Sequence, residues 1–241
     1  MKKIIIDIHT HIGKDIDGEK YSLKDLKKSM KKWGILKSVV FPFNTSDEKL
    51  IIESKKLLKI SKKDNSIIPF LRFNPKNITS NDLISLLNLG FFGVKLHPSA
   101  QKFVLDDKKL YKVYEIINSY NIPILFHTNA QDLKYSNPIK ILNIAKKFPN
   151  LKIIIAHFFG NDLSLIEKFK GFKSIYVDIS INSRTLRIEQ AVNVGIKLVF
   201  GSDAPYDSQG ISKLKIEESN ISRKQKNKIF YNNAKELLNL K

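Results

Sequence analysis

Several histidines and one aspartate stand at the ends of apolar, β-rich runs in this sequence. His9 and His11 are separated by a single threonine. Side chains alternate along a β-strand, so residues two apart share a face, and these two imidazoles could converge on one ion. Neutral imidazole suits zinc and the neighbouring transition metals. Taken alone, the pair is also compatible with two hydrogen-bonded polar residues at a strand end.

Further ligand candidates follow later apolar runs of the chain. His127 and His157 each end such a run, and Asp203 follows the last one. With His9 and His11, the side chains of His127 and Asp203 form a set of three histidines and one aspartate that leaves a position open for water. A metal held there would lower the pKa of its water, while Asp203 could accept the proton and His157 could stabilise developing negative charge. The sequence therefore predicts catalysis with one divalent metal, and the ligand types favour zinc.

Eight β-rich runs alternate with amphipathic segments, which is typical of βα units on a parallel sheet. The expected strands are Lys3–His9, Lys37–Phe43, Ser66–Phe73, Phe91–His97, Ile122–His127, Lys152–His157, Ser174–Ile179 and Lys197–Gly201. The expected helices lie near Ser22–Trp33, Asp47–Lys62, Ser80–Leu89, Asp107–Tyr120, Pro138–Phe148, Asp162–Phe169, Ser183–Val194 and Arg223–Leu240. Eight units in 241 residues favour an α/β fold of one domain, a single (β/α)8 TIM barrel over residues 1–241. A doubly wound open sheet is the structural alternative.

The ends of several expected helices carry recognisable signals. Ser22 and Asp25 have the spacing of a capping box, and Ser80 is a candidate N-cap. Glycines follow three helices where a C′ glycine is expected, at Gly34, Gly90 and Gly195. In a barrel the C-terminal ends of the strands form the active-site face. All five histidines of the chain would gather there, namely His9, His11, His97, His127 and His157.

The composition restricts the class of protein. There is no cysteine, which excludes disulfides, thiolate zinc sites and a cysteine nucleophile. No run approaches the roughly 18 apolar residues of a membrane-spanning helix, and the apolar start ends at Asp7, too early for a signal peptide. We therefore expect a cytoplasmic protein without a membrane partner. The net charge is +19, but only four of the 42 basic residues are arginines. Because the planar guanidinium of arginine is the group that suits phosphate recognition, nucleic acid is not favoured as a partner.

Six motifs, in order along nearly the whole chain, resemble those of the amidohydrolase superfamily. They are the segments Asp7–His11, Gly93–Pro98, Ile124–His127, Ala156–Gly160, Tyr176–Ser180 and Gly201–Pro205. The similarity is greatest to the amidohydrolase-2 branch, which includes aminocarboxymuconate semialdehyde decarboxylase. This resemblance implies a metal-dependent TIM-barrel hydrolase in which one divalent metal is held by His9, His11, His127 and Asp203. It also implies that His157 orients the water or polarises the substrate.

Lys95 is the main ambiguity of the expected site. In dihydroorotase-like relatives a lysine in a similar setting is carbamylated and bridges two metals. We expect one metal, with Lys95 binding an anionic group of the substrate or acting as a structural base; two metals bridged by carbamylated Lys95 are the alternative. His97 shares the strand face of Lys95 and is expected to face the substrate. Arg72, near the end of the third strand, could hold a substrate carboxylate.

Other polar residues near the expected pocket have weaker claims. For Asp7, Asn129, Asp178 and Tyr206 a purely structural role is at least as well supported as a functional one. Substrate choice is expected to depend on four loops between strands and helices. These loops are Gly13–Tyr21, Ser99–Asp106, Ala130–Asn137 and Ala204–Gly210.

The motifs allow several functions. The favoured one is hydrolysis of a C–N or C–O bond in a small, anionic metabolite by a metal-activated water. The alternative is non-oxidative decarboxylation, since the most similar branch contains such enzymes. The segment from Ser202 to Tyr206 also resembles TatD-type nucleases, but those carry a glutamate where this chain has Lys95. A non-enzymatic binding module would leave the ligand set unexplained. We expect a small-molecule substrate, and a homo-oligomer remains compatible with the sequence.

Overall fold

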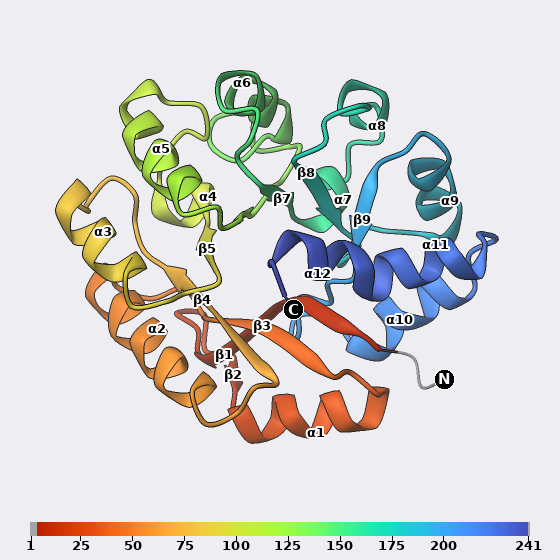
Figure 1. Ribbon diagram of the computed structural model, residues 1–241, viewed down its shortest axis with the longest axis horizontal. Coiled ribbons are helices and arrows are strands. Elements are labelled where there is room, and N and C mark those ends of the chain that lie inside the picture. The colour runs from red at the N-terminus through yellow and green to blue at the C-terminus, as the bar shows by residue number, and fades with distance from the viewer. Residues whose placement is uncertain (1–3, 241) are drawn as a thin grey trace.

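The computed structural model describes residues 4–240, which form a curled sheet with helices around its outside (Figure 1). The strands are β1 (Ile6–Lys14), β2 (Lys20–Tyr21), β3 (Lys37–Pro42), β4 (Ile67–Arg72), β5 (Gly93–Leu96), β6 (Ile124–Phe126), β7 (Ile153–Ile155), β8 (Ile175–Asp178) and β9 (Lys197–Val199). The α-helices are α1 (Leu23–Trp33), α2 (Asp47–Ser61), α3 (Ser80–Leu87), α4 (Pro98–Gln101), α5 (Tyr111–Ser119), α6 (Ile141–Lys147), α7 (His157–Gly160), α8 (Leu165–Lys168), α9 (Thr185–Asn193), α10 (Gln209–Glu217), α11 (Arg223–Asn227) and α12 (Asn233–Leu237). Short turns of other helix types are η1 (Lys108–Leu110), η2 (Pro138–Lys140) and the π-helical η3 (Lys228–Asn232).

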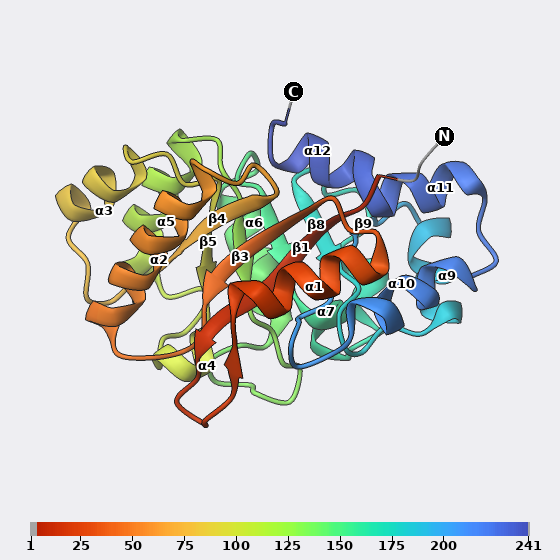
Figure 2. The same ribbon diagram turned by 90° about the horizontal axis from the view of Figure 1, so that it is seen from below.

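The nine strands follow one another in the order β2-β1-β3-β4-β5-β6-β7-β8-β9. Only β2 runs antiparallel to its neighbour; from β1 through β9 every described pairing is parallel. Hydrogen bonds also link β1 to the chain that follows β9, from Ile8 N to Phe200 O at 2.9 Å and from His11 N to Ala204 O at 2.8 Å. Figure 2 shows α4 and the β1–β2 hairpin at one end of the molecule and α12 at the other.

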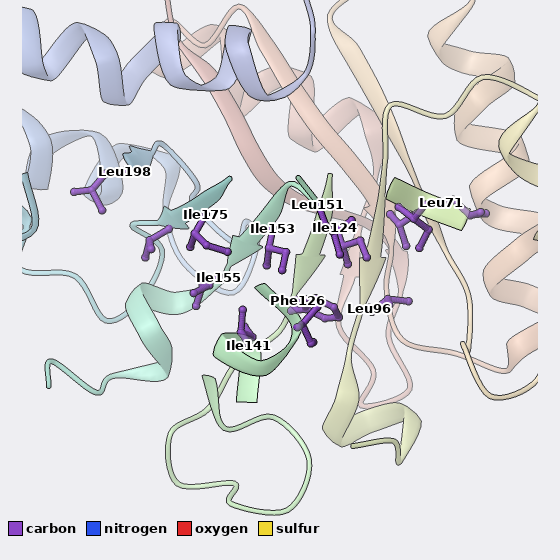
Figure 3. Close-up of a cluster of buried hydrophobic side chains, with 14 of the residues drawn as sticks. Leu71, Leu96, Ile124, Phe126, Ile141, Leu151, Ile153, Ile155, Ile175 and Leu198 are labelled. Atoms are coloured by element: carbon purple, nitrogen blue, oxygen red, sulfur yellow. The ribbon is translucent and has the colours of Figure 1, made fainter. Parts of the chain in front are cut away.

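The strands position the site through the two-residue alternation of their side chains. On β4, Phe70 is buried against the inner face of the sheet, and Arg72 at the end of the strand shares this face. Likewise, Leu125 on β6 is buried on the inner face, and His127, two residues later, shares this face. Residues of the opposite face pack between the sheet and the helices, where Leu71, Leu96, Ile124, Phe126 and Ile153 lie side by side (Figure 3). On the inner face of the sheet, apolar side chains thus lie toward the N-terminal ends of the strands, and polar side chains lie at the C-terminal ends.

The structure differs from the expected elements mainly at their ends. The first strand begins at Ile6 and continues to Lys14, so His9 and His11 lie within it rather than at its end, and Lys3 is outside the described residues. Helix α3 is capped by the side chain of Thr79, not by Ser80, which is already helical. The capping box of Ser22 and Asp25 is confirmed. Four elements were missed, namely the short strand β2 and the helices α4, α7 and α10.

No helix of residues 4–240 combines the length and the apolar character needed to cross a bilayer.

Candidate metal and active site

A cavity of about 740 Å³ opens where the parallel strands end. Its wall contains all eight residues that were expected to bind the metal, act in catalysis or bind the substrate, namely His9, His11, Arg72, Lys95, His97, His127, His157 and Asp203. Of the four residues with weaker claims, Asn129 and Tyr206 also line the cavity, whereas Asp7 and Asp178 do not. All four loops expected to govern substrate choice contribute to the wall, through Asp15, Ser99, Gln131 and Tyr206 among others. The volume lies within the range of small-molecule sites.

Asp203 is the centre of the histidine cluster. Its Oδ1 lies 2.9 Å from Nε2 of His9 and 3.0 Å from Nε2 of His11. Its Oδ2 lies 3.9 Å from Nδ1 of His157. Within residues 4–240, the ligand atoms of His9, His157 and Asp203 all lie within 4.8 Å of one another, close enough to share one ion. The structure thus brings together three of the four expected ligands, His9, His11 and Asp203, and it adds His157, which was expected to act on the water or the substrate.

His127 lies next to this group rather than within it. Its Nδ1 is 3.0 Å from Nε2 of His157, and its ring stacks on that of His97 with centroids 3.7 Å apart. Nδ1 of His97 accepts a hydrogen bond from Ala100 N at the start of α4. His97 thus has a helix-capping role in addition to lining the cavity, which the sequence did not indicate.

The imidazoles are held mostly in the neutral form that metal ligands require. Burial lowers the pKa of His11 to about 3 and that of His157 to about 4. Burial also opposes ionisation of Asp203, but the charges of His9 and His157 and the hydrogen bonds from the imidazoles outweigh it, so the pKa of the carboxyl is well below its ordinary value.

His9 is the exception among the imidazoles. Burial and Lys95 oppose its protonation, but Asp203 and Asp178 outweigh them and raise its pKa. One positive charge is therefore favoured between two carboxylates. A divalent cation could take over that position by displacing a proton.

Asp178 at the end of β8 forms hydrogen bonds with both His9 and His157. Its Oδ2 accepts a hydrogen bond from Nδ1 of His9 at 2.7 Å, which turns Nε2 of that ring toward Asp203. Its Oδ1 accepts from the backbone N–H of His157 at 2.9 Å and from the hydroxyl of Ser180 at 2.6 Å. A carboxylate behind a ligating histidine fixes the tautomer and ring orientation. Sequence reasoning assigned Asp178 no specific role. An available signal was its position at the end of an apolar strand, where other strands are followed by histidines.

Replacing Asp178 with asparagine is expected to weaken binding of a divalent metal by about 10–100-fold. The amide would present a donor group to Nδ1 of His9 or give up the contacts with His157 and Ser180. Titration of Mn²⁺ against a competing chelator dye measures the dissociation constant. Glu115→Gln, at an exposed position of α5, is the matched control. Equal metal affinity in Asp178→Asn and the control would contradict the orienting role.

The backbone after β7 forms an unusual left-handed turn. Five consecutive residues have positive φ, from His157 (φ 56°) through Phe158, Phe159 and Gly160 to Asn161 (φ 76°). A Cβ on Gly160 would come within 2.7 Å of Ala130 N, so only glycine fits there. Left-handed backbone disfavours L-residues with a Cβ. The turn brings His157 back toward Asp203.

Two cationic side chains are buried in the cavity wall. Lys95 on β5 is 1% exposed, and its Nζ lies 3.2 Å from Nε2 of His9. Burial lowers its pKa to about 7, which makes a neutral amine accessible near physiological pH. Arg72 pairs with Lys95 in the β4–β5 register and is also 1% exposed.

The side chain of Asp7 does not line the cavity but forms hydrogen bonds that connect neighbouring segments. Its Oδ1 accepts from Ser202 N at 3.0 Å and His9 N at 3.1 Å. Its Oδ2 accepts from the Ser202 hydroxyl at 2.6 Å and from Nε2 of Gln209 at 2.8 Å. The carboxylate thereby ties β1 to the segment carrying Asp203 and to the start of α10.

The residues present fit a divalent metal. Nε2 of His9 and Nε2 of His11 both face Oδ1 of Asp203. The other ring nitrogen of His9 is hydrogen-bonded to the carboxylate of Asp178. These donors, with neutral rings around them, are the ligands that zinc, manganese and iron use in proteins.

Comparison with known proteins supports these observations. A family model described as amidohydrolase matches residues 55–240. A search of curated proteins gave no significant match.

Solved structures resemble the chain over its full length. One is 2,6-dihydroxybenzoate decarboxylase from Rhizobium, with 15% identity, a TM-score of 0.76, and coverage of 100% of this chain and 99% of that one. A second is dihydroxybenzoic acid decarboxylase from Polaromonas sp. JS666 with bound manganese and the inhibitor 2-nitroresorcinol, with 15% identity, a TM-score of 0.76, and coverage of 99% and 97%. A third is an uncharacterised TIM-barrel protein from Bordetella bronchiseptica, with 18% identity, a TM-score of 0.80, and coverage of 98% of both chains. At such identities the resemblance shows the fold.

Proposed function

Because the chain belongs to the amidohydrolase family, and is an enzyme of that superfamily, we propose that it is a metal-dependent decarboxylase of a small carboxylic acid. The observation that carries this proposal is the full-length similarity to two decarboxylases, one with bound manganese, in a fold that gathers metal-type ligands at its cavity. The sequence favoured hydrolysis and kept decarboxylation as its alternative. The comparisons support the alternative better.

We propose His9, His11, His127 and Asp203 as the ligands of one divalent metal, either zinc or manganese. When bound, such an ion would polarise the substrate oxygens near the reacting carbon. Loss of CO2 from a carboxylate leaves a carbon that must take up one proton. Asp203 and His157 line the cavity and are the groups we assign to hold and deliver that proton. Lys95, His97 and Arg72 are the proposed substrate-binding residues.

Hydrolysis of a C–N or C–O bond is the second candidate function. The family description favours it, and the same side chains could serve it: Asp203 as the proton acceptor and His157 as the group that stabilises developing negative charge. In either reaction the substrate is a small molecule.

We also infer that the curled sheet closes as a (β/α)8 barrel and that residues 1–241 form one domain. The hydrogen bonds between β1 and the residues after β9, with the parallel bridge between Thr10 and Ala204, support this closure. The cytoplasmic location and the oligomeric state stay predictions.

Elemental analysis of protein purified without chelator tests the metal site, by comparing wild type with three alanine variants. We expect about one metal per chain, lost in His127→Ala but kept in Lys95→Ala and His157→Ala. Metal lost in His157→Ala and kept in His127→Ala would exchange the roles of these two residues. Close to two metals, with one lost in Lys95→Ala, would establish a carbamylated bridge. No metal under any loading would refute the proposed enzyme.

The reaction is then assayed with the metal-loaded protein. Release of CO2 from a panel of aromatic and unsaturated carboxylic acids is the expected result. Turnover of esters, lactones or amides without CO2 release would instead establish the hydrolase.

A further inference from the structure

The ring of His11 lacks the polar partner that orients its neighbours in the histidine cluster. Nδ1 of His9 lies 2.7 Å from Oδ2 of Asp178, and Nδ1 of His157 lies 3.0 Å from the hydroxyl of Ser180. Nδ1 of His11 is buried, and no residue within 4–240 forms a hydrogen bond with it. A ligating histidine usually donates this N–H to a carboxylate, a carbonyl or water, which fixes the orientation of its ring. The imidazole of His11 must therefore be held in another way.

Three aromatic rings surround the imidazole of His11. The ring of Phe41 is nearly perpendicular to it, with centroids 4.6 Å apart, and the ring of Phe43 stacks on it at 5.2 Å. The ring of Tyr206 is also nearly perpendicular, at an interplanar angle of 83° and a centroid distance of 5.3 Å. Phe41 and Phe43 are buried in the core, but Tyr206 is 48% exposed, so packing alone does not fix its ring.

Hydrogen bonds at both ends of Tyr206 hold its ring in place. The hydroxyl donates to Oδ2 of Asp15, a buried residue in the turn between β1 and β2. Oδ1 of Asp15 accepts from the backbone N–H of Ile16 at 2.7 Å, and the backbone N–H of Asp15 donates to the carbonyl of Glu19 at 2.8 Å. The backbone N–H of Tyr206 donates to the carbonyl of Asp203 at 2.9 Å. The phenol ring thus connects the β1–β2 turn to the segment that carries Asp203.

We propose that Tyr206, anchored by Asp15, is a positioning residue that orients His11 for metal binding. Its ring blocks rotation of the imidazole about the Cβ–Cγ bond, which would carry Nε2 away from Oδ1 of Asp203, now 3.0 Å distant. The aromatic contact takes the place of the hydrogen bond that orients His9. The inference rests on the proposed function for the role of His11 as a ligand, and it gives the β1–β2 hairpin a part in metal binding.

Metal affinity in the absence of substrate tests this role without turnover. Co²⁺ is titrated against a competing chelator dye, and we expect Tyr206→Leu to bind it about 10-fold more weakly than wild type. Tyr206→Phe and Asp15→Ala remove the same hydrogen bond, so each should bind Co²⁺ about fivefold more weakly. The visible absorption spectrum of bound Co²⁺ should change in Tyr206→Leu, because the ring of one ligand is reoriented. Tyr120→Phe, which removes a hydroxyl bonded to Asn88 outside the cavity, is the matched control.

A double variant separates the hydrogen bond from the charge of Asp15. If Asp15 acts through Tyr206, the combination of Asp15→Ala with Tyr206→Phe should bind Co²⁺ no more weakly than either single variant. Losses that add would overturn the proposal, because the carboxylate would then act on the cation directly. Wild-type affinity and an unchanged spectrum in Tyr206→Leu would overturn the positioning role alone. A wild-type protein that binds no metal would contradict the proposed function, and this inference with it.

Discussion

Replacement of Asp203 by asparagine is expected to lower turnover about 10³-fold or more. The carboxylate contacts Nε2 of both His9 and His11 through one oxygen, and its pKa is held well below the ordinary value, so it is ionised in the resting enzyme near neutral pH and can take up a proton during the reaction. Asparagine is nearly isosteric but removes both the negative charge and the capacity to hold a proton. The change therefore affects metal affinity and proton transfer together.

Turnover of the acid identified in the CO2 panel, measured with metal content on the same preparation, checks this prediction. Glu48→Gln, at an exposed position in the first turn of α2, removes one carboxylate without touching the cavity and should keep wild-type activity. Circular dichroism of Asp203→Asn should match wild type. Activity within tenfold of wild type at full metal occupancy would rule out Asp203 as the proton-transfer group.

Replacement of Asp7 by alanine is expected to lower the free energy of unfolding by about 3 kcal/mol. Burial raises the pKa of this carboxyl to about 6, so at pH 7.5 it is mostly ionised. It then accepts hydrogen bonds from Ser202, Gln209 and the backbone of His9. Alanine would leave these buried donors without a partner. Urea unfolding at pH 7.5 measures the loss.

The neighbouring hairpin offers a control for this change. Asp17→Ala alters an exposed aspartate of the same β1–β2 segment and should shift stability by less than about 0.5 kcal/mol. Asp7→Asn should lie between the two, since the amide oxygen can still accept from Ser202. If Asp7→Ala and Asp17→Ala unfold at the same urea concentration, the hydrogen bonds of Asp7 do not contribute to stability as proposed.

Much of the site could be predicted because its signal is local. A polar residue that follows an apolar β-run by strand periodicity must lie at the strand end, and parallel strands bring such ends together. His127 after β6 and Asp203 after β9 needed no other information. The family resemblance added the ligand set to this geometry.

The features that were missed depend on tertiary contacts. The hydrogen bond between Asp178 and His9 joins residues that are 169 positions apart. Helix α10 begins Gln209-Gly210, and glycine disfavours a helix, but here it gives room for the ring of Trp33, to which a Cβ would come within 2.2 Å. Thr79 and Ser80 are chemically equivalent caps, so only the backbone decides between them.

The left-handed turn after β7 has a consequence for how the protein loses activity. Positive φ at Phe158 and Phe159 is opposed by about 1–2 kcal/mol per residue, while complete burial of each phenylalanine contributes about 1.5–3 kcal/mol. Burial of the two rings thus offsets the local backbone preference, so the turn depends on the packing around it. Gentle heating should therefore release His157 before the sheet comes apart. The enzyme would stop working as a folded protein, and cooling would restore it.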